Sequence, residues 1–197
     1  MGISFVPSTE IFTHLAGSGL PAFSDLASAT TQYQLRPGEA LFRSAERQPY
    51  AFVINQGIIK LVYETPNGDL WIKGFAEAGI CFASLTALQE NGVTSFSAYA
   101  VTDAIVERIE YKKLQHLADQ HIEWQRALTN AFKYYGQRKE QREMELLTLT
   151  PEERYLLFIN KHPELVAVLR QVDIASYIRI TPVALSRIRA RIKTVLS

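Results

Sequence analysis

Short apolar or β-branched runs alternate with turn-forming residues over residues 30–109, and this pattern constrains the fold more than any other feature of the chain. The runs include YAFVINQ and IIKLVYE, and the separators include LRPGE, QG and PNGD. Strands this short, divided by turns at this density, are typical of an antiparallel sandwich or roll. The pair Asn67-Gly68 predicts a hairpin with a type I′ turn, because Asn and Gly tolerate the positive φ that both central positions require.

Helical spacing replaces the strand pattern after Glu110. Apolar and aromatic residues then recur at spacings of three, four or seven, at Leu114, Leu117, Trp124, Leu128, Ala131 and Tyr135. The longest predicted element is a helix over about residues 121–147. Its apolar stripe fits equally a seam with a second copy of the chain or a packing face against its own roll. Before the strands, residues 8–29 predict a broken helix that covers the roll and is interrupted at GSGLP.

A second helical unit is expected to begin at Thr150. Thr150 can cap the helix, Pro151 suits the first helical position, and Glu153 completes a Thr-x-x-Glu capping box. The linker before it, LLTLT, is short and apolar, so this unit should be docked or hinged and not carried on a flexible tether. The boundary between the two units is therefore expected near Thr148.

Positive charge is concentrated at the carboxyl end of the chain. Residues 170–197 contain six Lys or Arg and one Asp, a balance of +5, whereas the whole chain has a formal net charge of +1. The first 169 residues therefore sum to −4. An asymmetry of this kind points to a contact with nucleic acid.

The basic end predicts two short helices, over residues 172–178 and about 182–195, joined by a tight turn at Arg179 and Ile180. Ala175 is a small residue where the helices would cross, and Thr181 is a natural cap for the second helix. The pattern resembles a helix-turn-helix. Arg179 departs from the Gly that this turn usually carries, and a left-handed Arg costs on the order of 1 kcal/mol.

The second of these helices has an apolar stripe and an outward face of small residues and Arg187. A helix that enters the major groove needs small residues for close approach, and Arg187 suits a bidentate contact to guanine, while the other cations suit phosphates. The predicted DNA-contacting residues are Arg179, Thr181, Val183, Ser186, Arg187, Arg189, Arg191 and Lys193. The alternative is a solvated basic helix in an all-helical end domain.

The composition and the reactive residues exclude several classes of protein. An apolar share of 47% is ordinary for a chain that buries a core, and no run of about 18 apolar residues could span a bilayer. We therefore expect a cytoplasmic protein without membrane association. Cys81 is the single cysteine, which excludes an intrachain disulfide. The four histidines are scattered without metal-binding or nucleophile-type spacing, so we expect no enzyme, no metal and no cofactor.

The order of roll, long helix and basic end, together with LTPEERYLLFINKHPEL and DIASYIRITPVALSRIR, resembles the catabolite activator and fumarate/nitrate regulator (CRP/FNR) family of bacterial transcription regulators. Residues 148–191 resemble in particular the members that end soon after the recognition helix without a β-wing. The resemblance implies an α+β fold with three parts: a cyclic-nucleotide-binding-type antiparallel β-roll over 1–120, a long dimerisation helix over 121–147, and a C-terminal all-α helix-turn-helix domain over 148–197.

The resemblance also implies partners. It implies two-fold symmetric double-stranded DNA and an unidentified small-molecule effector, leaves open a contact with RNA polymerase, and implies a homodimer joined through Trp124, Leu128, Ala131 and Tyr135. The rival hypothesis is a sensor or adaptor that kept the fold but lost sequence-specific DNA binding. Arg179 and Val183 favour this rival, since relatives usually carry Gly and often carry Glu at these positions.

The expected effector site departs from the family pattern. Cyclic-nucleotide binders of the family hold ribose and phosphate with a Gly-Glu pair and an Arg-Ser or Arg-Thr pair, and the positions that align with these pairs hold other residues here. A desolvated phosphate needs a compensating cation or several oriented amides, so cyclic AMP is not expected to bind in the usual way. The pocket either takes another ligand or is filled and structural, and its predicted residues are Phe82, Ser84, Thr94 and Ser95.

Overall fold

The computed structural model describes residues 5–196, apart from the side chains of Ala27 and residues 193–196. The amino-terminal part forms the roll and its cover, from elements α1 (Ser8–Ala16), the 3-10 helix η1 (Phe23–Ala29), β1 (Thr30–Leu35), β2 (Ala40–Phe42), β3 (Tyr50–Gln56), β4 (Ile58–Glu64), β5 (Leu70–Glu77), β6 (Cys81–Phe82), β7 (Ser97–Ala100) and β8 (Ala104–Glu110). The helices that follow are α2 (Tyr111–Gln120), α3 (Ile122–Thr148), α4 (Pro151–Lys161), α5 (Pro163–Val168), α6 (Gln171–Ile178) and α7 (Pro182–Leu196).

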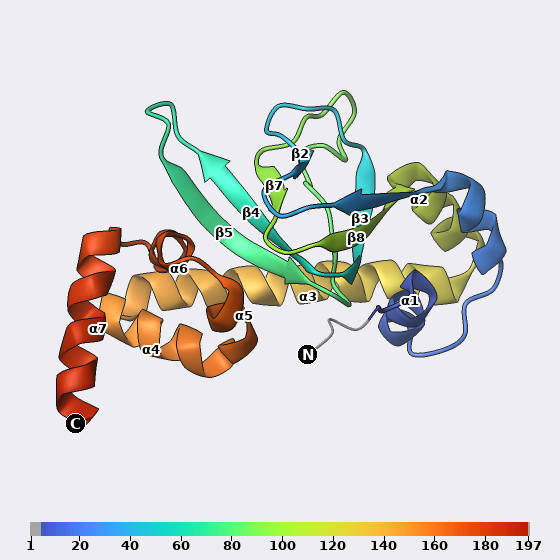
Figure 1. Cartoon of the computed structure of the whole chain (residues 1–197). Helices are drawn as coiled ribbons and strands as arrows, with labels where there is room; N and C mark the ends of the chain where they lie inside the picture. The colour runs from blue at the N-terminus through green and yellow to red at the C-terminus, as the bar shows by residue number, and fades with distance from the viewer. Residues whose placement is uncertain (1–4, 197) are drawn as a thin grey trace.

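The strands form two antiparallel sheets of four strands each, in the orders β1-β8-β3-β6 and β2-β7-β4-β5. Apolar side chains from both sheets meet in one cluster, which includes Phe42, Phe52, Ile54, Ile59, Phe96 and Val106. The α+β fold with an antiparallel roll is therefore confirmed. Figure 1 shows the hairpin of β4 and β5 reaching beyond the rest of the roll toward α6.

The hairpin between β4 and β5 is confirmed, but the predicted type I′ turn is wrong. Gly68 has a φ of 82°, whereas Asn67 is not among the residues with positive φ. The amide of Gly68 donates to the carbonyl of Thr65 at 2.9 Å, so Pro66 and Asn67 are the central residues of the turn. The proline ring holds φ near −65°, which excludes type I′ and favours a turn that starts one residue earlier, with glycine in the left-handed position after it.

The helices α1 and η1 cover the roll where α3 begins, as the broken helical pattern predicts. The Trp124 side chain is fully buried there, with its ring centroid 5.5 Å from that of Phe12 and 5.8 Å from that of Phe23. Its indole Nε1 donates to the carbonyl of Pro21 at 2.8 Å. The prediction that Trp124 contacts a second copy of the chain is therefore wrong, because its side chain is buried between the roll and its cover.

The predicted long helix and the helix start after it are both present. The 27 residues of α3 run along the whole molecule from the roll to the C-terminal helices (Figure 1). At the start of α4 the amide of Glu153 donates to Thr150 Oγ1 at 3.3 Å, and the Thr150 amide donates to Glu153 Oε2 at 2.8 Å. This reciprocal capping box stops α3 and starts a new helix within two residues. None of the described helices is both long and apolar enough to cross a membrane.

The C-terminal helices are docked on the hairpin of β4 and β5. Lys60 Nζ lies 2.7 Å from Asp173 Oδ1, which joins β4 to α6. Ser176 Oγ accepts from the Ile72 amide at 2.9 Å and donates to the Leu70 carbonyl at 2.8 Å. Beneath these polar contacts a single apolar cluster contains residues of both parts, among them Ile72, Phe75, Phe158, Ile174 and Ile178. The short linker therefore leads into a docked unit.

Replacing Ser176 with Ala should lower the free energy of unfolding by about 1–3 kcal/mol, because the buried amide of Ile72 then loses its partner. Urea unfolding followed by circular dichroism measures this change. Ser24→Ala is the matched control, since Ser24 is exposed and its hydroxyl bonds to its neighbour Asp25, and it should change stability by less than about 0.5 kcal/mol. Equal effects of the two variants would show that the Ser176 contact does not hold α6 to β5.

Candidate functional site

The helices α6 and α7 form a helix-turn-helix. Ala175 is fully buried at the crossing of the two helices, and its carbonyl accepts from the Ile180 amide at 3.0 Å. Arg179 lies in the left-handed region, with φ 64° and ψ 48°. Thr181 Oγ1 accepts from the Ala184 amide at 3.2 Å and caps α7. The helix ends, the turn and the cap all agree with the sequence pattern.

Arg179 tolerates its left-handed backbone through a contact outside the motif. Its guanidinium lies 4.2 Å from the centroid of the Trp71 ring, on β5. A cation stacked on an indole face gains on the order of 1 kcal/mol, which offsets the cost of replacing glycine at the turn. Its side chain therefore lies on the hairpin in this structure, and its predicted contact with a phosphate stays a prediction.

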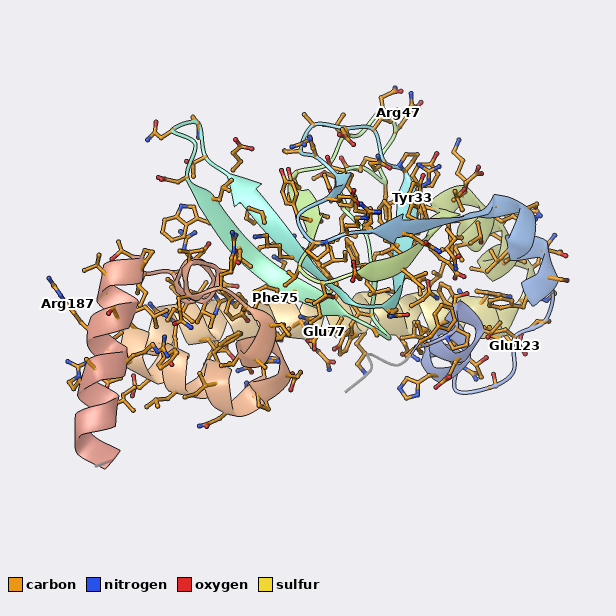
Figure 2. The ribbon with its side chains drawn as sticks, viewed as in Figure 1. Tyr33, Arg47, Phe75, Glu77, Glu123 and Arg187 are labelled. Atoms are coloured by element: carbon orange, nitrogen blue, oxygen red, sulfur yellow. The ribbon has the colours of Figure 1, made fainter. Side chains whose placement is uncertain are left out.

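The outward face of α7 matches the face predicted to read DNA. Leu185 and Ile188 are buried toward α6, whereas Val183 is 62% exposed. Ser186 and Arg187 are also exposed, and Figure 2 shows Arg187 pointing away from the body of the molecule. This face carries small residues and one long hydrogen-bonding side chain, which is the combination that allows a close approach to base edges.

The other predicted cations have different surroundings. Arg189 is half-buried, and Arg191 forms an ion pair with Glu152 of α4. The side chain of Lys193 lies outside the described residues. Arg191 would have to exchange its carboxylate partner for a phosphate to contact DNA.

The predicted effector residues are mostly occupied by contacts within the roll. Thr94 is buried, and its Oγ1 donates to the Arg43 carbonyl at 2.6 Å. Ser84 is also buried, and its Oγ accepts from the Ser95 amide at 3.2 Å. Ser95 is exposed, and Phe82 is half-buried. The structure thus places the four residues near one another, but it leaves the Ser84 and Thr94 hydroxyls engaged in internal bonds.

Aromatic rings occupy the interior of the roll beside these residues. The Phe42 ring lies 5.0 Å from Phe52, 5.5 Å from Phe96 and 6.3 Å from Phe82, measured between centroids. Rings at these distances pack against one another and help to fill the interior of the roll. This arrangement supports the structural alternative for the part of the pocket that would hold a cyclic phosphate.

A separate cavity lies between the roll, α3 and α6, and most of the residues that line it carry no predicted role in the sequence. It has a volume of about 100 Å³ and is lined by Lys73 of β5, Phe82 of β6, Tyr135 and Lys139 of α3, and Tyr177 of α6, among others. Lys73 Nζ lies 3.8 Å from the centroid of the Phe96 ring. The sequence did contain a sign of this site, because Lys73 is a charged residue within the strand run LWIKGF.

The pKa values of several groups that line the cavity are shifted from their ordinary values. Burial, the positive charge of Lys139 and a hydrogen bond with it together lower the pKa of Lys73 to about 7. Burial also lowers the pKa of Lys139 below its usual range. Cys81, on the same wall, has its pKa raised to about 12 by burial, so its thiol is unreactive at neutral pH. The cavity therefore holds two amino groups whose charged forms are disfavoured, next to an apolar wall.

Three potential metal ligands meet where β5 faces the C-terminal helices. Glu77, His162 and Glu164 place one ligand atom each within 4.8 Å of one another. Burial raises the pKa of Glu77 against the opposing charge of Arg138, and burial, with the charges of Arg138 and Lys161, lowers the pKa of His162. Because positive charge is already supplied here, we assign no metal to this cluster.

The predicted dimer stripe on α3 keeps three of its four residues at the surface. Leu128, Ala131 and Tyr135 are each partly exposed, in contrast to Trp124. Phe132, on the same side of the helix, is 41% exposed. An apolar helix surface with this exposure is free to pack against a second copy.

Comparison with known proteins agrees with the roll and the overall architecture. Residues 32–121 match the family described as cyclic nucleotide-binding domain. The structure is similar to FixK2 from Bradyrhizobium japonicum, with a TM-score of 0.72 and 20% identity over 84% of this chain and 85% of that one. It is also similar to the c-di-GMP responsive global regulator CLP of Xanthomonas campestris, with a TM-score of 0.70 and 12% identity over 85% of this chain and 88% of that one.

A third similar structure is the catabolite activator protein of Thermus thermophilus, with a TM-score of 0.55 and 18% identity over 93% of this chain and 87% of that one. A sequence comparison with curated proteins gives no match. Residues 32–121 thus match a cyclic nucleotide-binding domain, and α3 joins this part of the chain to the helix-turn-helix. The resemblance to CRP/FNR regulators is confirmed at the level of this domain and of the fold. The subgroup without a β-wing stays a prediction.

Lys73 should make stability depend on pH in a defined direction. Its pKa is lowered from 10.5 to about 7 on folding, so the unfolded chain binds more protons between these values and stability should rise with pH across that window. Lys73→Met removes this contribution. The advantage of Lys73→Met over the parent should therefore shrink by about 1–3 kcal/mol from pH 7 to pH 10, in urea unfolding.

Lys133→Met is the control, since Lys133 is exposed on the same long helix. Its stability difference from the parent should stay constant over the same range. A constant difference for Lys73→Met as well would show that Lys73 stays charged in the folded chain.

Proposed function

We propose that this chain is a dimeric, DNA-binding transcription regulator of the CRP/FNR type that acts in the cytoplasm. The observation that carries the proposal is the capped helix-turn-helix whose outward face presents Val183, Ser186 and Arg187 to solvent. The +5 balance of residues 170–197 supplies the long-range attraction to phosphates. The fold similarity to structures of regulators supports the same function.

Dimerisation belongs to the proposal because one helix-turn-helix rarely makes enough contacts for specific binding. The partly exposed residues Leu128, Ala131 and Tyr135 support a pairing of α3 with its copy. With α3 paired, the two α7 helices would be related by two-fold symmetry and would read a palindromic site. In this reading the roll, α3 and the helix-turn-helix act as effector domain, dimerisation helix and DNA-binding domain over 1–120, 121–147 and 148–197.

Cyclic AMP is not the effector in this proposal. The predicted phosphate position holds Ser84 and Thr94, and both hydroxyls bond within the roll. Neither residue can supply the charge or the planar fork with which arginine holds a phosphate. If a small-molecule effector acts on the roll, it is another compound, and the proposal leaves a contact with RNA polymerase open.

A second candidate function is a sensor or adaptor that does not bind specific DNA. Two observations favour it: the Arg179 guanidinium lies on Trp71, and Arg191 is paired with Glu152. Both cations are thus engaged within the chain. Selection of bound sequences from random DNA separates the two functions, since a regulator enriches one palindromic motif and an adaptor enriches none.

Leu128→Asp should convert the proposed dimer to a monomer, because it places a carboxylate in the centre of the apolar contact between two α3 helices. Light scattering at micromolar concentration measures the mass, and circular dichroism checks the fold. Thr129→Asp, one residue away and exposed, should leave the mass unchanged. A parent protein that is already monomeric would reject the pairing through α3.

Arg187→Ala and Arg191→Ala should weaken DNA binding in different ways. Loss of Arg187 should cost about 1–3 kcal/mol on the selected site and relax the preference at one base pair. Loss of Arg191 should weaken selected and scrambled duplexes alike, and should make the salt dependence shallower by about one counterion per subunit. Titrations of both duplexes at several salt concentrations measure these quantities.

Arg47→Ala is the matched control, because Arg47 is an exposed arginine on a loop of the roll, far from α7 (Figure 2). It should leave affinity and salt dependence unchanged. Equal losses for Arg187→Ala on selected and scrambled duplexes would show that α7 is only a basic surface.

A further inference from the structure

We propose that the cavity between β5, β6, α3 and α6 binds a small apolar carboxylate, whose anionic group lies between Lys73 and Lys139. This inference deepens the proposed function, because it names the chemical class of an effector. Only the effect of that ligand on DNA binding rests on the proposed function; the binding itself does not. The site differs from the predicted pocket at Ser84, Thr94 and Ser95, and of that pocket only Phe82 lines this cavity.

A break in strand pairing places Lys73 at the cavity. Gly74 pairs with Leu61 and Ile72 pairs with Val62, so Lys73 is an extra residue of β5 that has no partner on β4. An extra residue of this kind bends the strand and redirects a side chain out of the regular alternation. Lys73 then lies over the Phe96 ring, at 3.8 Å, and within 5.1 Å of the Tyr63 ring centroid.

The two lysines lack an anionic partner. In the part of the chain that the structure describes, neither Lys73 nor Lys139 takes part in an ion pair. The arginines on the same wall are engaged with backbone carbonyls, since Arg138 donates to Phe75 and Arg142 donates to Tyr177. Two like charges held together away from water are costly, and an anion placed between them offsets that cost.

The placement of the Lys73 and Lys139 amines in one cavity adds a second reason for an anion. An ammonium group has donors and no acceptor, so two lysine amines can share a hydrogen bond only when one of them is neutral. A carboxylate accepts from two ammonium groups at once. Its entry would let both amines be charged and would give each of them a charge-assisted hydrogen bond.

The rest of the cavity selects for an apolar body of limited size. Phe75, Ile80, Phe82 and Phe96 line it, and its volume is about 100 Å³. A dry apolar cavity of roughly 150 Å³ accommodates benzene, so this one suits a short aliphatic acid or, with slight opening, a single aromatic ring. A cyclic nucleotide is too large for it.

A ligand in this cavity would change the contacts of the helix-turn-helix with the rest of the chain. Tyr177 of α6 lines the cavity, and the Arg142 guanidinium lies 4.0 Å from its ring centroid while donating to its carbonyl. A carboxylate near Lys139 adds negative charge one helical turn from Arg142. Ligand entry therefore acts on the contact that holds α6 against α3.

Isothermal titration of the full-length protein with benzoate, and with butyrate as the smaller acid, tests the site. At least one of the two acids should bind with one site per chain, and benzamide, which has the same ring without the charge, should bind at least about tenfold more weakly. Lys73→Met and Lys139→Met should each weaken binding by about tenfold or more. Lys73→Arg keeps the charge and should retain binding within about threefold, and Lys133→Met should bind like the parent.

The possible results distinguish a failure of the carboxylate site from a failure of the proposed function. No binding of either acid, equal binding of benzamide, or an equal loss in Lys133→Met would overturn the carboxylate site, provided that thermal melts show folded variants. DNA selection is run without acid, so a failure there rejects the regulator and leaves the binding result standing.

Discussion

A buried carboxylate at the first turn of α6 attaches the C-terminal helices to the roll, and the rest of the arrangement depends on it. Asp173 is 7% exposed and accepts from Lys60 of β4 at 2.7 Å and from Arg170 at 2.9 Å. Burial alone would raise the pKa of Asp173, but the hydrogen bonds from Arg170 and Lys60 hold it below the usual value. An ion pair of this kind fixes geometry more than it adds stability, and the stability comes from the apolar cluster beneath it.

Three consecutive residues of β5 connect the docked helices to both candidate sites. Trp71 carries the Arg179 guanidinium at the turn, the Ile72 amide donates to Ser176 of α6, and Lys73 enters the cavity. A shift of this strand would thus change the contacts of the Arg179 turn, of α6 and of the lysine pair together. Packed interfaces of this type change between discrete arrangements, which is the physical basis on which a ligand near Lys73 could alter the orientation of α7.

Local sequence signals predicted the helical half of the structure well. The capping box at Thr150 and Glu153, the cap at Thr181 and the left-handed turn at Arg179 are all found where the sequence places them. Two details failed for nonlocal or competing reasons. Asn67-Gly68 alone would have formed a type I′ turn, but Pro66 set a different turn type. The apolar stripe of α3 is buried within its own chain at Trp124 and reaches the surface farther along the helix.

The sequence by itself determined the order of elements, the change from strand to helix near Glu110, the helix-turn-helix and the basic character of its end. These features follow from contacts between residues close in the chain and from side-chain chemistry that needs no partner. Only the tertiary structure decided that Ser84 and Thr94 are engaged within the roll, that Lys73 meets Lys139, and that α6 docks on β5. Each of these depends on residues between 11 and 104 positions apart being brought together by packing, and periodicity along the chain carries no information about such pairs.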